Sequence, residues 1–377
     1  MRDVAVIGAG PVGATLAALL AGSGLDVVVY EARPGPSAQE RILALSEASR
    51  QILADARAWP EPAASITSIH ISQKGGPGRT VLDAAEQSLA ALGHTVSYTR
   101  LEETLAARLR EARIPIVYGA SCREIAVGSD AATIHLSSGD EARARLLVLA
   151  DGGANAARIP GIAFTEKDYG QHAVIGIIAT DRLHGGRAYE RFTPQGPVAL
   201  LPVEAGYAFV WTASPAEAER LLVLDDASFL ASFQAHFGDR AGRFTGVRNR
   251  MAFALRLRAV NVPIALRTAI VGNAAQALHP IAGQGLNLGL RDAASLAAVI
   301  LCTPRERVGD PQMLDAYRES RRRDAGRGVA FTDFLVSAFA DGRRLPTWGR
   351  GLALVALDLV PAARRALASR MIHGSMR

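Results

Sequence analysis

The chain has little cysteine and lacks the histidine spacings of a metal site. Its 377 residues include two cysteines, Cys122 and Cys302, which excludes a framework of several disulfides and a Cys-rich metal centre. The eight histidines show no H-x-x-x-H or H-E-x-x-H spacing, so we expect no metal. Low-complexity tracts and repeats are also missing. Hydrophobic residues at 49% and charged residues at 21% are typical of a globular protein, with length enough for one large or two medium domains.

The sequence also predicts neither a targeting segment nor a membrane-spanning segment. Too few residues precede Gly8 for a signal peptide, and the apolar stretch 348–360 is too short to span a bilayer, so we expect a cytoplasmic protein. The chain has no basic stripe interleaved with aromatic residues, so we expect no nucleic-acid partner. The net charge of +6 comes from residues 343–377, with seven arginines and one acid. This segment predicts peripheral contact with an anionic membrane face or an acidic partner, or a C-terminal helix packed on the fold with its arginines in water.

The N-terminus contains a strand, a glycine turn, a helix and a second strand. In the G-x-G-x-x-G turn, Gly8 allows the tight bend, Gly10 lets the backbone approach a pyrophosphate, and Gly13 lets the helix pack closely on the sheet. Glu31 ends the second strand 18 residues after Gly13, where a carboxylate can bind an adenosine ribose. The residues expected at this dinucleotide are Gly8, Gly10, Pro11, Val12, Gly13, Glu31, Ala32 and Arg33.

A second glycine-rich junction occupies residues 272–292. It follows an apolar strand, 268–271, and leads into a helical pattern, with glycines at 283, 285 and 289. A helix N-terminus reached through glycines offers unpaired N–H groups to an electron-rich ligand. The junction therefore predicts a second contact with the same dinucleotide.

The rest of the chain predicts an α/β fold with an inserted sheet. We expect a helix over 42–55, a helix over 100–112, a strand over 114–118 that returns to the first sheet, and a hairpin over 125–136. Alternating strands fill about 161–255, interrupted by one helix, 226–237, and the chain beyond Asp292 is helical. The predicted domains are a Rossmann-like nucleotide-binding domain of 1–66, 97–160 and 256–325, a mostly antiparallel substrate domain of 67–96 and 161–255, and a basic helical segment, 326–377.

Three motifs in this order resemble the flavin-dependent aromatic hydroxylases of the para-hydroxybenzoate hydroxylase type. The first is the glycine turn with Glu31 and Arg33, the second an Asp-Gly motif at 150–158, and the third the 272–292 segment. The motif L-H-P-I-A-G-Q-G-L-N-L-G at 278–289 is similar to the motif found in the ubiquinone-biosynthesis branch of this family. Residues 41–45 and 237–240 also fit, so the likeness covers nearly the whole chain.

The chain departs from the family pattern at two positions of the third motif. Asn273 replaces an Asp whose carboxylate binds the ribityl hydroxyls of FAD, and Gln276 replaces a His. An Asn amide oxygen still accepts hydrogen bonds from hydroxyls. The variant looks like that of the 2-polyprenyl-6-methoxyphenol hydroxylases, which favours a subtype marker. The usual Ser of the Asp-Gly motif is also absent at 154–155.

The resemblance implies an FAD-dependent monooxygenase that hydroxylates a polyprenylated phenol in ubiquinone biosynthesis. In that family the reduced flavin forms a C4a-hydroperoxide with O2, and the protein holds the ring and excludes water. No second dinucleotide fingerprint is present, so the reductant is NADPH or NADH bound transiently, or an electron-transfer protein. A homo-oligomer is left open, as is contact of the basic C-terminus with a ubiquinone-biosynthesis complex or with the inner face of the cytoplasmic membrane. The rival interpretations are a hydroxylase of a small soluble aromatic and a non-catalytic FAD-binding subunit of a biosynthetic complex.

The resemblance also assigns residues to the flavin. Pro280 lines the ring on the substrate side, and His279 is either a catalytic base or a residue that fixes the loop by a hydrogen bond to backbone. Asp151 binds loop backbone or the ribityl region, and the Cys122 thiol is expected to behave as a small apolar group. The further residues expected at the cofactor are Arg41, Arg100, Cys122, Asp151, Asn273, Gly283, Gly285, Leu286 and Asn287.

Overall fold

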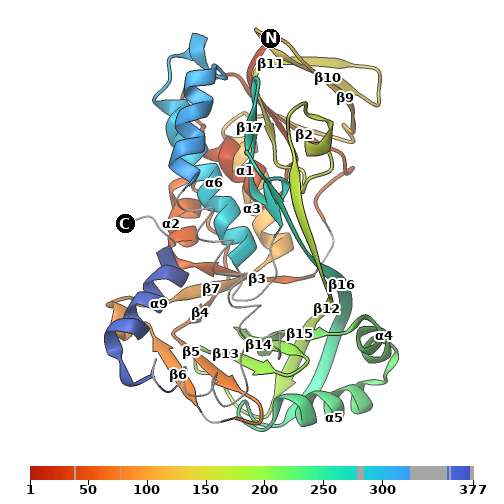
Figure 1. Cartoon of the computed structure of the whole chain (residues 1–377), viewed down its shortest axis with the longest axis vertical. Coiled ribbons are helices and arrows are strands. Elements are labelled where there is room, and N and C mark those ends of the chain that lie inside the picture. The colour runs from red at the N-terminus through yellow and green to blue at the C-terminus, as the bar shows by residue number, and fades with distance from the viewer. Residues whose placement is uncertain (38–39, 77, 278–283, 323–354, 356–357, 374–377) are drawn as a thin grey trace.

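The fold contains two large sheets with a small sheet between them. The structure is a computed structural model and describes residues 1–37, 40–76, 78–277, 284–322, 355 and 358–373. Figure 1 shows the two eight-stranded sheets towards opposite ends of the longest axis, with the three-stranded sheet between them. The predicted α/β class with an inserted sheet is confirmed. The predicted domain boundaries stay a prediction.

The first sheet is built around the N-terminal strand. Its order is β17-β18-β11-β1-β2-β8, and every pair along it is parallel except β17 with β18. The predicted 125–136 hairpin is confirmed as β9 and β10, which extend β11, and the strand expected over 114–118 is confirmed as β8 beside β2. The strands are β1 (Arg2–Ile7), β2 (Val27–Glu31), β8 (Ile116–Tyr118), β9 (Cys122–Val127), β10 (Ala132–Leu136), β11 (Glu141–Leu149), β17 (Ile264–Ala265) and β18 (Thr268–Ile270).

Helices α1 (Pro11–Leu19), α3 (Tyr98–Glu111) and α6 (Gln284–Leu301) form a core with one face of this sheet. Val4 and Val6 of β1 are fully buried in that core, together with Leu16 of α1. Burying such side chains contributes about 25 cal/mol per Å² of apolar surface. Because parallel strands with covered faces are apolar throughout, β1 shows a continuous apolar run rather than alternation.

The predicted helix over 42–55 is wrong in its first part. Residues Ile42–Ser46 form a strand, β3, and only Glu47–Asp55 form a helix, α2. β3 pairs with β7 (Gly93–Ser97), which also pairs with β4 (Ala64–Ile66). The hydroxyl of Ser46 accepts a hydrogen bond from the Ser49 N–H and caps α2, so the helix begins where the strand ends.

The second sheet is mostly antiparallel and has helices on one face. Its order is β19-β16-β12-β15-β14-β13-β5-β6, with β13 and β5 the parallel pair. The prediction of one helix within 161–255 is wrong, because α4 (Pro215–Val223) precedes α5 (Asp226–Phe237). The strands are β5 (Ser68–Gln73), β6 (Arg79–Asp83), β12 (Phe164–Thr180), β13 (Arg187–Thr193), β14 (Gly196–Val203), β15 (Gly206–Ala213), β16 (Phe244–Val260) and β19 (Gln276–Ala277).

The two faces of the second sheet have different surroundings. Trp211 and Phe209 of β15 are buried against Phe229 and Phe233 of α5. Figure 1 shows α4 and α5 on that side, and the small sheet on the other. On that other side β14 meets β7, where the Thr95 hydroxyl donates to the Pro202 carbonyl. The second sheet is therefore held between two helices and the rest of the molecule.

The C-terminal helix packs on the fold. Ala368 and Ile372 of α9 (Pro361–His373) are buried in a cluster with Ile71 and Phe192 of the second sheet. Arg364 pairs with Glu86 through its Nη2 at 2.6 Å from Oε1. The expected packing of a C-terminal helix is thus confirmed over these residues, but Arg364 is paired with Glu86 and mostly buried rather than in water. Most of the apolar stretch 348–360 lies outside the described residues.

Candidate cofactor site

The glycine turn at 8–13 leaves one position open. A Cβ on Gly8 would lie 2.5 Å from the Ala150 carbonyl oxygen, and one on Gly13 only 2.1 Å from the Gly8 carbonyl oxygen. At Gly10 no atom lies within 4 Å of such a Cβ. Gly10 is the N-cap of α1 without a side-chain cap, and Pro11 takes the first helical position. Open space therefore faces a helix N-terminus whose first turn no side chain covers.

Glu31 lies at the end of β2 beside this turn. Glu31 is 7% exposed, and its carboxylate accepts hydrogen bonds from the Ala9 N–H at 2.9 Å and from the Arg33 N–H and Nε at 3.0 Å each. Burial raises the pKa of Glu31, but the hydrogen bonds from Arg33 and Ala9 outweigh it, so the pKa is lowered overall. Glu31 therefore carries its charge at neutral pH, next to the glycine turn.

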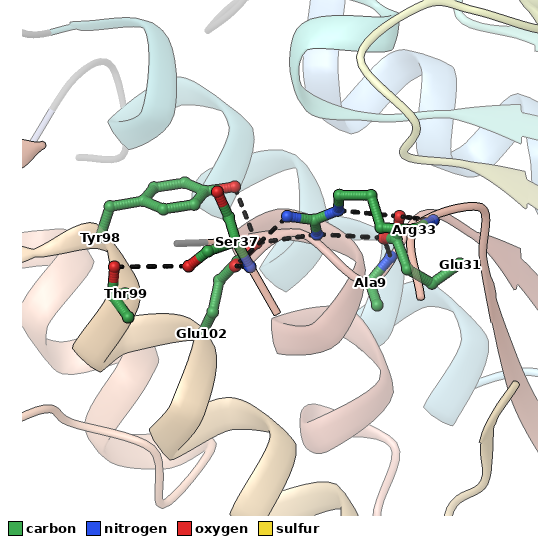
Figure 2. A network of polar contacts seen from close by, with 7 residues as sticks. All are labelled: Ala9, Glu31, Arg33, Ser37, Tyr98, Thr99 and Glu102. Carbon is green, nitrogen blue, oxygen red and sulfur yellow. Dashed lines mark hydrogen bonds and ion pairs between the residues drawn. The ribbon is translucent and has the colours of Figure 1, made fainter. Parts of the chain in front are cut away.

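Arg33 joins Glu31 to a second buried carboxylate, Glu102 of α3. The Arg33 Nη2 lies 3.0 Å from Glu102 Oε1, and the Tyr98 hydroxyl donates to the same oxygen at 2.8 Å. The Ser37 N–H donates to the other oxygen at 2.8 Å. Figure 2 shows Glu31, Arg33, Glu102 and Tyr98 in one continuous network. Sequence reasoning missed Glu102, because nothing near it in sequence signals a partner 69 residues away.

The two arginines predicted from the resemblance lie near the start of α3. The Arg41 guanidinium stacks on the Tyr98 ring at 4.1 Å, and its buried Nε has no hydrogen-bond partner among the described residues. Arg100 lies in the first turn of α3 and is exposed. An orphaned buried Nε is costly unless an acceptor is present, so Arg41 is suited to an anionic ligand.

The start of α6 lies against the small sheet. The Asn287 side chain accepts from the Ser46 N–H at 2.8 Å and donates to the Ala44 carbonyl at 3.0 Å, both in β3. Gly285 has open space around a built Cβ, whereas one on Gly289 would lie 2.8 Å from Val12 Cγ2. Gly289 thus permits close packing of α6 on α1. Leu286 is half-buried, and the predicted residues His279, Pro280 and Gly283 lie outside the described residues.

The Gly272 turn is anchored by a buried carboxylate that the sequence did not single out. Asp292 of α6, 2% exposed, accepts from the Gly272 N–H at 2.9 Å and from the Gln276 amide at 2.7 Å. Its other oxygen pairs with Arg321. Burial raises the pKa of Asp292 to about 6, and Arg321 acts against that shift. Gln276 is therefore part of an anchor, and exposed Asn273 lies in the turn that this anchor holds.

Asp151 and Cys122 lie at the edge of the site. Asp151 accepts from the Gly153 N–H and the Asn155 N–H at 3.0 Å each, so it binds loop backbone, one of its two expected roles. Cys122 begins β9, and its carbonyl accepts from Arg158 Nη1 at 2.9 Å. Burial raises the pKa of its thiol, which packs as a small apolar group at the edge of a core. Among the described residues no group of side chains could hold a metal.

A family model described as an FAD binding domain matches residues 1–332. The chain belongs to this family. Ubiquinone hydroxylase UbiL of Rhodospirillum rubrum is 32% identical over 97% of this chain and 88% of its own length. The 3-demethoxyubiquinol 3-hydroxylase of Escherichia coli is 29% identical, with 96% of each chain covered. Both names belong to ubiquinone metabolism, the pathway expected from the motifs.

Solved structures show the same fold. The crystal structure of p-nitrophenol 4-monooxygenase PnpA from Pseudomonas putida matches with a TM-score of 0.79 at 19% identity, covering 100% of this chain and 99% of that chain. The predictions of an FAD-dependent aromatic-ring monooxygenase and of FAD as its cofactor are confirmed. The residues assigned to FAD stay predictions.

The residues of this chain fit FAD. Open space at Gly10 matches the close approach of a pyrophosphate, and the charged Glu31 lies beside it, where a ribose would be. The buried Nε of Arg41 still needs an acceptor. These three observations come from segments that the fold brings together at the carboxyl ends of β1 and β2, where such sheets bind ligands.

A further ionisable residue, which the sequence did not single out, lies on the second sheet. Glu190 of β13 is half-buried, and burial alone raises its pKa from 4.5 to about 8. Its side chain makes no hydrogen bond or ion pair with any other described residue. Burial thus favours the neutral form of Glu190, which is unusual for a carboxyl group.

This shift predicts a pH-dependent contribution of Glu190 to stability. The unfolded chain releases the proton near pH 4.5, whereas the folded chain keeps it up to about pH 8. Because the folded state then binds more protons, raising the pH through this window lowers the free energy of unfolding. Glu190→Gln removes the effect. The melting temperature of this variant, measured by calorimetry, should match wild type below pH 4.5 and exceed it by on the order of 2–4 °C near pH 8. The same difference in melting temperature between the variant and wild type at both pH values would contradict this prediction.

Proposed function

We propose that this protein hydroxylates the aromatic ring of a polyprenylated phenol in ubiquinone biosynthesis, with FAD as the oxygen-activating group. The observation that supports this most is the likeness to ubiquinone hydroxylase UbiL along 97% of the chain. The second sheet adds to it, because its face towards the nucleotide domain exposes parts of Ala199, Val210 and Ile175. An apolar surface of small and branched side chains suits a prenylated ring.

The chain's own residues would bind and orient the cofactor. The first turn of α1 beyond Gly10 would bind the pyrophosphate, and Glu31 would accept hydrogen bonds from the adenosine ribose. Arg41 would pair with phosphate or the ribityl chain. Backbone N–H groups at 285–287 would face the flavin ring, where negative charge develops. When bound, FAD supplies the oxygen chemistry, so no side chain has to act as a nucleophile.

Purification and genetic complementation test the proposed function. We expect a yellow protein that consumes O2 and a nicotinamide cofactor, or a protein reductant, and adds one oxygen atom to a prenylated phenol. Expressed in a bacterium that lacks a ubiquinone ring hydroxylase, it should restore ubiquinone. Mass spectrometry of the intermediate that disappears names the ring position.

The rival functions give different results. A yellow enzyme that turns over only small soluble phenols would identify a hydroxylase outside ubiquinone biosynthesis. A yellow protein that restores ubiquinone only alongside another hydroxylase, and has no turnover of its own, would be a non-catalytic subunit. A colourless protein after gentle isolation would contradict all three.

Contact with a membrane surface is the finer part of the proposal. No helix within the described ranges has the length and apolar character needed to cross a bilayer. Leu359, just before α9, is 74% exposed, Val360 is 48% exposed, and Arg365 is exposed on the helix. Exposed apolar residues beside a cation suit the interface of an anionic membrane. Failure to sediment with anionic vesicles would contradict this contact.

A further inference from the structure

Glu190 points to the face of the second sheet that lies opposite α4 and α5. Its neighbour Tyr189 faces the helices, because the Tyr189 hydroxyl donates to the Arg240 carbonyl at 3.2 Å and its ring packs on Phe237 of α5. Side chains alternate along a strand. The Glu190 side chain therefore lies on the opposite face, towards the small sheet and the nucleotide domain (Figure 1).

Glu190 is the one ionisable residue in an apolar row across this face. The strand register places it directly opposite Ile71 on one side and Ala199 on the other. The full row, from β5 to β16, is Ile71, Glu190, Ala199, Val210, Ile175 and Met251. Beyond the row, the next described cation on this face is Arg248 of β16, which is exposed and pairs in register with Ile177 of β12. It is four strands away from β13, roughly 19 Å, too far to neutralise a carboxylate in this row.

The row lies next to the segments that would hold the flavin. Asn287 of α6 binds β3, β3 pairs with β7, and Thr95 of β7 donates to Pro202 of β14, the strand beside Glu190. Ala368 of α9 is buried in one cluster with Ile71, at the β5 end of the row. Along the row, Glu190 thus lies between the buried Ile71 and the partly exposed Ala199, Val210 and Ile175.

We propose that Glu190 hydrogen-bonds the ring hydroxyl of the phenol and thereby selects a neutral, hydroxyl-bearing ring. This inference rests on the proposed function. A carboxyl group offers both a donor and acceptors, which match the two hydrogen-bonding roles of a phenol hydroxyl. A site built to bind a hydroxyl rejects the analogue that lacks it, because the buried group is then left unpaired. The raised pKa of Glu190, about 8, is consistent with a neutral carboxyl at neutral pH. Anionic rings find no partner in this row.

Ligand binding to the purified flavoprotein tests this role. The probes are a phenol with one prenyl unit and the methyl ether of the same phenol, and binding is followed by the change in flavin absorbance. Wild type should bind the phenol about 10-fold more tightly than the ether, which is the effect of one hydrogen bond. Glu190→Leu should bind both within about 2-fold, with wild-type flavin content. Glu204→Leu, at an exposed position after β14, is the matched control and should keep the wild-type preference.

Infrared difference spectroscopy gives a readout that does not depend on the leucine variant. The carboxyl C=O band that Glu190→Gln removes should shift in wild type when the phenol binds and stay in place with the ether. An unchanged band, or a Glu190→Leu variant that keeps the phenol preference, would overturn the role of Glu190. Wild type that binds neither probe would instead overturn the proposed substrate class.

Discussion

Asp292→Ala should lower the free energy of unfolding by about 3–5 kcal/mol and release the flavin. The substitution removes the carboxylate from Arg321, whose side chain is 3% exposed, and leaves that cation without its buried counter-ion. It also removes the acceptor of the Gly272 N–H and of the Gln276 amide, at 2.9 and 2.7 Å. The Gly272–Ala274 turn would then lose its attachment to α6.

Asp315→Ala is the matched control for Asp292. Asp315 pairs with Arg318 at 2.9 Å, but both side chains are about half exposed, so its loss should change stability by less than about 1 kcal/mol. Denaturant unfolding and the FAD content after gel filtration measure both effects. An Asp292→Ala variant as stable as Asp315→Ala would show that Asp292 does not anchor the turn.

The cofactor end of the fold could be predicted from the sequence because its signals are local. Gly8, Gly10 and Gly13 lie within six residues, and each follows from a steric demand of one turn. Glu31 could be predicted at the dinucleotide because of its spacing from the same turn. The structure confirms the steric part, since a Cβ at Gly13 would lie 2.1 Å from the Gly8 carbonyl oxygen.

The partners of these residues could not be predicted, because they come from distant parts of the chain. Glu102 reaches Arg33 across 69 residues, and Asp292 reaches Gln276 across 16. In the sequence Gln276 is only a departure from a family pattern. In the structure its amide and the Gly272 N–H share one oxygen of Asp292. Glu190 was missed for a similar reason, since its apolar surroundings come from neighbouring strands.

Two errors in the predicted elements have separate causes. Residues 42–46 are rich in Leu and Ala, which favour helix, but pairing with β7 overrides that local preference. The missed helix α4 had a signal that could have found it. Ser214 caps α4 with Pro215 at the first helical position and Glu217 in the first turn, a pattern typical of a helix start.

Gly10→Ala should give a folded protein that has lost most of its affinity for FAD. The new Cβ meets no protein atom within 4 Å, and the φ of −67° at Gly10 suits any residue. The apoprotein should therefore keep its stability within about 0.5 kcal/mol. The methyl group would, however, occupy the space in which the pyrophosphate approaches the backbone. A loss of about 2 kcal/mol or more of binding free energy corresponds to a dissociation constant that is higher by about 30-fold or more.

Gly13→Ala separates this effect from a failure to fold. Its Cβ would lie 2.1 Å from the Gly8 carbonyl oxygen, a backbone atom that cannot move without distorting the turn. This variant should lose thermal stability even as the apoprotein, whereas Gly10→Ala should lose only the flavin. Absorbance of the purified proteins, FAD titration of each apoprotein and calorimetry distinguish the two. If Gly10→Ala protein stays yellow and binds FAD with wild-type affinity, the pyrophosphate binds elsewhere. The added methyl group can weaken FAD binding only if the pyrophosphate lies against Gly10.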